Sequence, residues 1–131
     1  MGKVALVAHD AKKALLVDWV GQRIENFMSL DLVATGTTGK VLLERFPGLR
    51  LERLESGPLG GDQQIGSRIV AGGIDALFFF IDPLTPMPHD VDVKALLRLA
   101  ILYDVPCAFS PRTADLILAG VMRLHLTRGP A

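Results

Sequence analysis

The chain has 131 residues, of which 50% are hydrophobic and 21% are charged, and 14 basic residues balance 14 acidic ones. This length predicts a single domain over residues 1–131, and the apolar composition excludes an intrinsically disordered chain. The formal net charge is zero, so the chain lacks the excess of basic residues that a general nucleic-acid-binding protein has, and we expect no nucleic-acid partner.

The first half of the chain alternates short apolar runs with amphipathic stretches. Residues 4–8 form a continuous apolar run, typical of a strand buried on both faces. Apolar residues at helical spacing predict a helix over 11–28, with Asp10 as a candidate cap. A second strand is predicted at 32–34, and the glycine-rich connection TGTTG then leads into a helix over about 40–46.

The second half continues this alternation around the clearest buried strand, DALFFFI at residues 75–81. Before it come a strand over 49–54, a glycine-rich loop at 56–61 and a helix over 62–71. A loop with three prolines follows at 82–89, and its shape should be firmly held. The remaining predicted elements are a helix over 90–103, a strand over 105–109 and a helix over 113–119.

Five strands that alternate with helices indicate an α/β fold. We expect a doubly wound, mainly parallel five-stranded sheet flanked by helices, which is a Rossmann-like architecture. In such sheets the ligand binds at the carboxyl ends of the strands. The polar and glycine-rich segments of this chain follow strands, at residues 9–10, 35–39, 56–62 and 82–90. The sequence therefore predicts one functional site at this edge of the sheet.

The segment TGTTG at residues 35–39 favours anion binding. Glycines let the backbone approach an anion, a helix start presents free N–H groups, and threonine hydroxyls donate further hydrogen bonds. An ordinary strand-to-helix turn is the alternative. Lys13, one turn into the first predicted helix, could add a counter-charge or could simply be solvated.

Carboxylates and histidines at the same edge are candidates for acid–base chemistry. Asp62 is either a base poised to take a proton from a substrate or the N-cap of the next helix. His89 could donate to a carbonyl, whereas Asp90 could cap the helix that follows. His9 either lines the pocket or is structural, and Asp82 is first of all a turn residue at a strand end.

The sequence also argues against several kinds of site. The single cysteine, Cys107, lies in a predicted buried strand and should be an inert thiol. No Cys/His cluster has zinc spacing, so no metal is expected. The strongest apolar run, 76–81, is far too short to cross a membrane, and we expect a soluble, cytoplasmic protein without a membrane partner. This inventory suits a small phosphorylated substrate and proton-transfer chemistry.

The same segments closely resemble the methylglyoxal synthase family. The resemblance covers residues 4–119, and the motifs TGTTG, SGPxGGDQQ and PHDxDVKALLRLA, which follow one another in this order along the chain, make it highly specific. The matching segments are VAHD at 7–10, ATGTTG at 34–39, SGPLGGDQQ at 56–64, DPL at 82–84, PHD at 88–90, VKALLRLA at 93–100 and TAD at 113–115.

The resemblance implies a lyase that converts dihydroxyacetone phosphate to methylglyoxal and inorganic phosphate, as a homohexamer without metal or organic cofactor. It implies that Asp62 is the catalytic base and that His89 polarises the substrate oxygens. Asp92, supported by Asp10 and Asp82, would complete the proton-transfer network. The residues that it assigns to the substrate and its phosphate are His9, Lys13, Thr35, Gly36, Thr37, Thr38, Ser56 and Gly57.

The fold also resembles the allosteric ligand-binding domain at the end of carbamoyl-phosphate synthetase large subunits. The alternative is therefore a regulatory module that binds a phosphate ligand without catalysis, and such a module would be expected at the end of a longer chain. It needs the phosphate-binding loop but not Asp62, His89 and Asp92, which favour the enzyme. The resemblance fades after Asp115, so no arginine in the segment 123–131 is assigned to the phosphate site.

Overall fold

The computed structural model describes residues 2–84 and 90–128 of the chain. Its centre is a five-stranded sheet in the order β3-β2-β1-β4-β5, in which neighbouring strands are parallel. The predicted doubly wound α/β fold is confirmed. The strands are β1 (Lys3–Ala8), β2 (Leu32–Ala34), β3 (Leu51–Arg53), β4 (Ile74–Phe80) and β5 (Cys107–Ala108).

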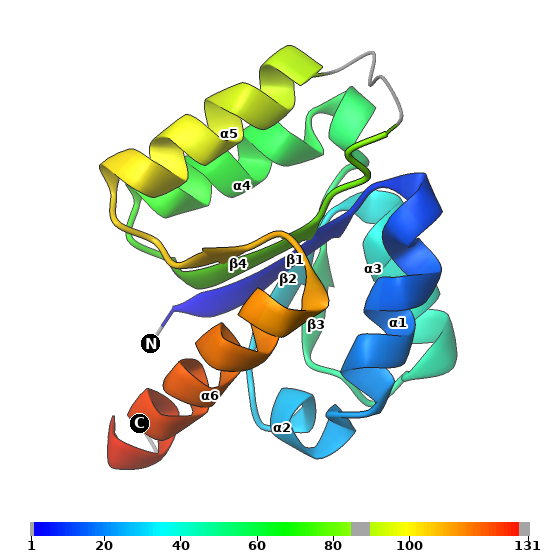
Figure 1. Ribbon diagram of the computed structural model, residues 1–131, viewed down its shortest axis with the longest axis vertical. Coiled ribbons are helices and arrows are strands. Elements are labelled where there is room, and N and C mark those ends of the chain that lie inside the picture. Colours follow the sequence, from blue (N-terminus) through cyan, green and yellow to red (C-terminus); the bar gives the residue numbers. More distant parts are fainter. Residues whose placement is uncertain (1, 85–89, 129–131) are drawn as a thin grey trace.

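Helices cover both faces of the sheet (Figure 1). α1, α2, α3 and α6 pack on one face, whereas α4 and α5 lie side by side on the other. The direction of winding changes between β1 and β4. These strands are adjacent in the sheet, although 65 residues lie between the end of β1 and the start of β4. The helices are α1 (Lys13–Gly21), α2 (Ile24–Met28), α3 (Gly36–Arg45), α4 (Gly61–Val70), α5 (Asp90–Leu102) and α6 (Pro111–Arg128).

Strand β4 contributes side chains to the cores on both faces of the sheet. Phe78 and Phe80 pack with Trp19 of α1, at ring-centroid distances of 5.2 and 5.6 Å. Leu77 and Phe79 belong to the core under α4 and α5. All four strand residues are at most 1% exposed. Burial stabilises by about 1.5–3 kcal/mol for each such side chain, which explains why this stretch is apolar without alternation.

The predicted helix over 11–28 is divided in the structure. A 3-10 turn at Asp10–Lys12 precedes α1, and α2 starts after Arg23, whose φ of −126° is not helical. A Cβ on Gly21 would lie only 2.9 Å from Cζ of Phe46, so the phenyl ring occupies the space beside the end of α1. Asp10 is not a helix cap, contrary to the prediction, because its carboxylate pairs with Lys13 instead.

The boundaries of four further predicted elements differ from the structure. The glycine-rich segment 35–39 is not a loop before the helix, because α3 already starts at Gly36. β3 and β5 are shorter than predicted, since β3 can pair only with three-residue β2 and β5 pairs only with β4. α6 continues well beyond the predicted end at residue 119, because Val121 and Met122 still pack against the core.

Candidate functional site

The carboxyl ends of β1 and β4 form the topological switch point of the sheet. His9 directly follows β1, and the backbone N–H of Asp82, just beyond β4, donates to Nδ1 of His9 over 2.9 Å. Because Nδ1 accepts this bond, the neutral imidazole carries its proton on Nε2. The ring also packs edge-on to Phe79, at 5.2 Å between centroids. Backbone and core therefore fix both the orientation and the tautomer of His9.

Asp62 is a buried carboxylate in the first turn of α4, with 3% of its surface exposed. Gly60, with φ of +105°, is the N-cap of this helix, so the predicted alternative of Asp62 as N-cap is wrong. A Cβ on Gly61 would lie 2.1 Å from the carbonyl oxygen of Glu55. The two glycines therefore let the chain turn tightly against the preceding loop, and this turn directs Asp62 inward. The amino end of α4 favours a negative charge at this position.

The amino end of α3 offers backbone donors to an anion. Thr35 is its N-cap and makes no side-chain capping hydrogen bond. The N–H of Gly36 donates to the carbonyl of Glu55, whereas those of Thr37 and Thr38 have no acceptor among the hydrogen bonds of the described residues. Free amides at a helix start can bind an anion. Anion binding by TGTTG therefore stays a prediction, to which this helix start offers backbone donors.

A cavity of about 90 Å³ at this edge gathers many of the predicted residues. Its wall combines a lysine, two threonines, two carboxylates and a histidine with backbone of the glycine-rich loop. Lys13 binds the exposed carboxylate of Asp10, which lies one turn earlier. The predicted site residues that line this cavity are His9, Asp10, Lys13, Thr35, Thr37, Gly57 and Asp62.

Other predicted site residues lie outside that cavity. Gly36 and Ser56 line an adjoining, more open one of about 670 Å³. Thr38 is 1% exposed and lines neither cavity, and within the described part of the chain its hydroxyl has no hydrogen-bond partner. The carboxylate of Asp82 accepts from the backbone N–H of Leu84 over 3.1 Å, as its predicted turn role requires. His89 lies outside the described residues.

Two glutamines that follow Asp62 were missed as functional candidates. Nε2 of Gln63 donates to Oδ1 of Asp92 over 2.7 Å, and Oε1 of Gln64 accepts from the backbone N–H of Glu55 over 2.9 Å. The signal was present, since both residues belong to the segment SGPLGGDQQ. Phe79 was interpreted only as core, but it also lines the small cavity.

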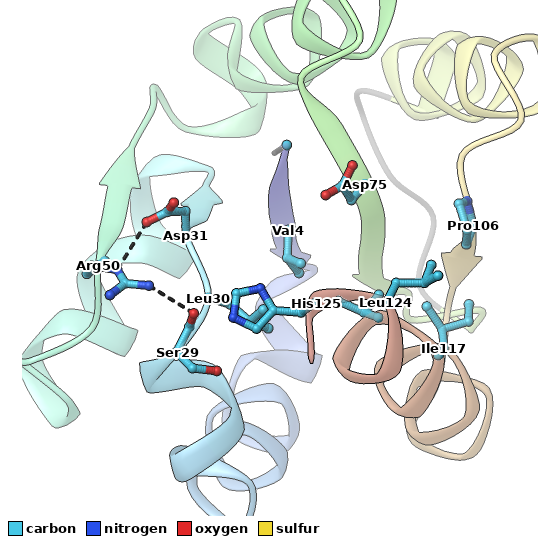
Figure 2. Close-up of a pocket in the computed structure, with 13 residues that line it drawn as sticks. Val4, Ser29, Leu30, Asp31, Arg50, Asp75, Pro106, Ile117, Leu124 and His125 are labelled. Carbon is cyan, nitrogen blue, oxygen red and sulfur yellow. Dashed lines mark hydrogen bonds and ion pairs between the residues drawn. The ribbon is translucent and has the colours of Figure 1, made fainter. Parts of the chain in front are cut away.

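Another cavity, of about 310 Å³, lies at the opposite, amino edge of the sheet between β1, β4 and α6 (Figure 2). None of the predicted site residues lines it. Arg50 lines this cavity, and its guanidinium group already has two partners. It binds the carboxylate of Asp31 at 3.0 Å and donates to the carbonyl of Ser29 at 2.9 Å. Much of the remaining wall is apolar, and includes Val4 and Ile117.

Three further findings concern metal ligands, membrane spans and the single cysteine. Over residues 2–84 and 90–128, no group of three or more His, Cys, Asp or Glu side chains could hold a metal ion. In the same ranges, no helix is both long enough and apolar enough to cross a membrane. Burial raises the pKa of the Cys107 thiol, so a thiolate nucleophile is disfavoured there.

Comparison with known proteins gives one consistent family. The model described as "MGS-like domain" matches residues 16–109. The chain is 55% identical over 115 residues to a methylglyoxal synthase of Rhizobium rhizogenes, covering 88% of this chain and 91% of the relative. It is 51% identical over 115 residues to one of Oleidesulfovibrio alaskensis, covering 88% and 78%. A crystal structure of methylglyoxal synthase from Elizabethkingia anophelis matches with a TM-score of 0.83 at 49% identity, covering 89% of this chain and 76% of that chain.

Proposed function

The chain belongs to the methylglyoxal synthase family, and from this premise we propose that it converts dihydroxyacetone phosphate to methylglyoxal and inorganic phosphate. One observation carries the proposal. The buried carboxylate of Asp62, the imidazole of His9 and the threonines at the start of α3 line the same small cavity. That set combines a base, a hydrogen-bond donor and an anion site within reach of one small molecule.

The burial of Asp62 supports catalysis over the regulatory alternative. Removing a carboxylate from water costs free energy, and next to a bound phosphate it also adds electrostatic repulsion. A module that only bound a phosphate ligand would gain nothing from such a group. A base that must act on a substrate carbon, by contrast, has to lie inside the cavity that holds the substrate.

The reaction follows from the positions of these groups. Asp62 takes a proton from the hydroxymethyl carbon of the substrate, and the electron pair left behind forms an enediolate with the neighbouring carbonyl. A donor such as the Nε2–H of His9 stabilises the oxygen that gains negative charge. The hydroxyl on the deprotonated carbon then gives up its proton to the departing phosphate and becomes the aldehyde carbonyl. The carbon–carbon double bond moves to the carbon that carries the phosphate, and the electron pair of the breaking C–O bond leaves with the phosphate. The enol that remains tautomerises to methylglyoxal.

The residues that bind the phosphate have a second role in this scheme. The enediolate can also be protonated, which gives an isomer of the substrate instead of methylglyoxal, so these residues have to favour elimination. Elimination requires the breaking C–O bond to align with the enediolate π system. The amides of α3, with Thr35, Thr37 and Lys13, therefore have to hold the leaving phosphate out of the enediolate plane. By family resemblance, Thr38, Gly36, Ser56 and Gly57 complete this binding region.

The remaining assignments also rest on the family. We expect His89 to polarise the substrate oxygens, and Asp92, Asp10 and Asp82 to support proton transfer. We expect the enzyme to work in the cytoplasm as a homohexamer without a cofactor. The exposed apolar side chains of Ile101 and Leu116, 81% and 74% exposed, support burial between subunits.

The test is an assay of the purified protein with dihydroxyacetone phosphate that counts methylglyoxal and phosphate together. We expect equal amounts of both products. Asp62→Asn keeps the shape of the side chain but removes the base, so kcat should fall by about 100-fold or more. Asp31→Asn, a carboxylate at the amino edge, is the matched control and should leave kcat unchanged.

Two outcomes would contradict parts of the proposal. Activity that survives in Asp62→Asn would assign the proton transfer to another carboxylate. Stabilisation of the wild-type protein by phosphate without any turnover would favour the regulatory module instead.

A further inference from the structure

Gln63 and Gln64 stand next to each other on α4 but contact different parts of the molecule. Gln64 accepts from the backbone N–H of Glu55 and so ties the glycine-rich loop to the helix. Gln63 is exposed and donates across to Asp92 in the first turn of α5, over 2.7 Å. Asp62, one residue earlier, points into the core-facing cavity. Gln63 therefore connects the two helices that carry the proposed carboxylates.

The packing of α4 against α5 gives this hydrogen bond a fixed geometry. Gly66 lies one turn after Gln63 on the same side of α4, and a Cβ there would lie 2.9 Å from Cδ1 of Leu99 in α5. The two helices therefore approach closely, while Ile65 and Ile69 fill the core beneath α4. This close approach brings the side chain of Gln63 within reach of Asp92.

The hydrogen bond from Gln63 to Asp92 joins polar side chains of α4 and α5 directly. The interface also includes the apolar residues Ile65, Val93 and Leu96. Apolar contacts fix the distance between two helices but do not orient a carboxylate. Gln63 supplies that orientation.

We propose that Gln63 is a positioning residue for the reaction: its amide holds the carboxylate of Asp92 in the orientation that the proposed part of Asp92 in proton transfer requires. This inference rests on the proposed function. An amide is suited to the role because it donates a hydrogen bond without carrying charge. A lysine or arginine at this position would also attract Asp92, but its positive charge so close to Asp62 would weaken that carboxylate as a base.

The experiment compares Gln63→Met and Gln63→Glu with wild type by steady-state kinetics and thermal unfolding. Met keeps the length of the side chain but cannot donate, so kcat should fall about tenfold while KM and Tm stay close to wild type. Glu has the same shape as Gln but carries a negative charge that faces Asp92, so kcat should fall further than in Gln63→Met. Ser67→Ala, an exposed position one turn along the same helix, is the control and should keep wild-type kcat.

A double-mutant cycle tests whether Gln63 acts through Asp92. In an Asp92→Ala background the substitution Gln63→Met should have no further effect on kcat. An equal loss in both backgrounds, an unchanged kcat in Gln63→Met, or a fall in Tm that accompanies the fall in kcat would overturn the inference alone. Absence of methylglyoxal from the wild-type assay would overturn the proposed function, and this inference with it.

Discussion

Both edges of the sheet carry charged side chains, but the two edges use them differently. At the amino edge Arg50 neutralises Asp31, and the cavity of about 310 Å³ beside them is largely apolar. At the carboxyl edge Asp62 is buried at 3% exposure beside a cavity of only about 90 Å³. Exposed ion pairs contribute little to the stability of the folded protein, whereas burying a carboxylate costs folding free energy. The two edges therefore differ in whether a carboxylate is buried or paired at the surface, and the buried one lies at the edge where we propose that the chemistry takes place.

The most severe way to disrupt the carboxyl edge is Gly61→Ala. Its Cβ would meet the carbonyl oxygen of Glu55 at 2.1 Å, a backbone atom that cannot move aside without opening the loop. We expect the free energy of unfolding to fall by about 3 kcal/mol, with loss of activity, as measured by urea denaturation and product assay.

Gly120→Ala on α6, beside the amino-edge cavity, is the control for that substitution. No atom lies within 4 Å of the position that its Cβ would take. The change should stabilise the helix by about 0.5–1 kcal/mol. Equal destabilisation by both glycine substitutions would contradict the difference between the two edges.

A second, smaller effect concerns ligand binding. Inorganic phosphate at about one hundred times its Kd should raise the free energy of unfolding by about 2.7 kcal/mol, seen as an increase in Tm. Lys13→Met and Thr37→Val remove a charge and a hydroxyl from the cavity wall and should reduce that increase. His125→Gln, in the amino-edge cavity, should leave it unchanged. If only His125→Gln abolished the phosphate-dependent increase in Tm, the anion would bind at the amino edge and the prediction would be contradicted.

The smallest expected effect tests a structural ion pair. Hydrogen bonds from Arg68 and Lys3 lower the pKa of Glu52 to about 2, from an ordinary value of 4.5. Its stabilising contribution is therefore complete above pH 4.5 and is lost as the pH falls toward 2. The Glu52 side chain is 40% exposed, so Glu52→Gln should cost less than about 1 kcal/mol at neutral pH. The urea midpoints of the wild-type protein and Glu52→Gln should converge as the pH falls toward 2. A difference between them that does not change with pH would contradict the lowered pKa of Glu52.

The sheet, and the edge at which the polar segments meet, were predictable from the sequence because both depend on local patterns. Continuous apolar runs mark strands buried on both faces, and the residues after them must then meet at one edge. Element boundaries were less accurate. The first predicted helix is divided at Arg23, and the ring of Phe46 lies beside Gly21 at the end of α1. These two residues are 25 positions apart, and no local pattern reveals their contact.

The sequence predicted candidate residues that the structure gathers around one cavity, but not their individual geometry. It could not exclude Asp62 as a helix cap, because the capping position depends on the left-handed conformation of Gly60. The cross-helix contact of Gln63 was missed for a similar reason. Its partner, Asp92, lies 29 residues further along the chain, and only the packing of α4 on α5 brings the two together.

The donors at the start of α3 have a consequence for inhibition and resistance. Backbone amides belong to every residue except proline, so replacing the side chain of Thr37 or Thr38 leaves the N–H group in place. An inhibitor with a phosphonate head bound to these amides would keep that anchor through most point substitutions. Resistance to such an inhibitor would require a change in the backbone of α3 itself, and that change would also weaken the proposed binding of the substrate phosphate.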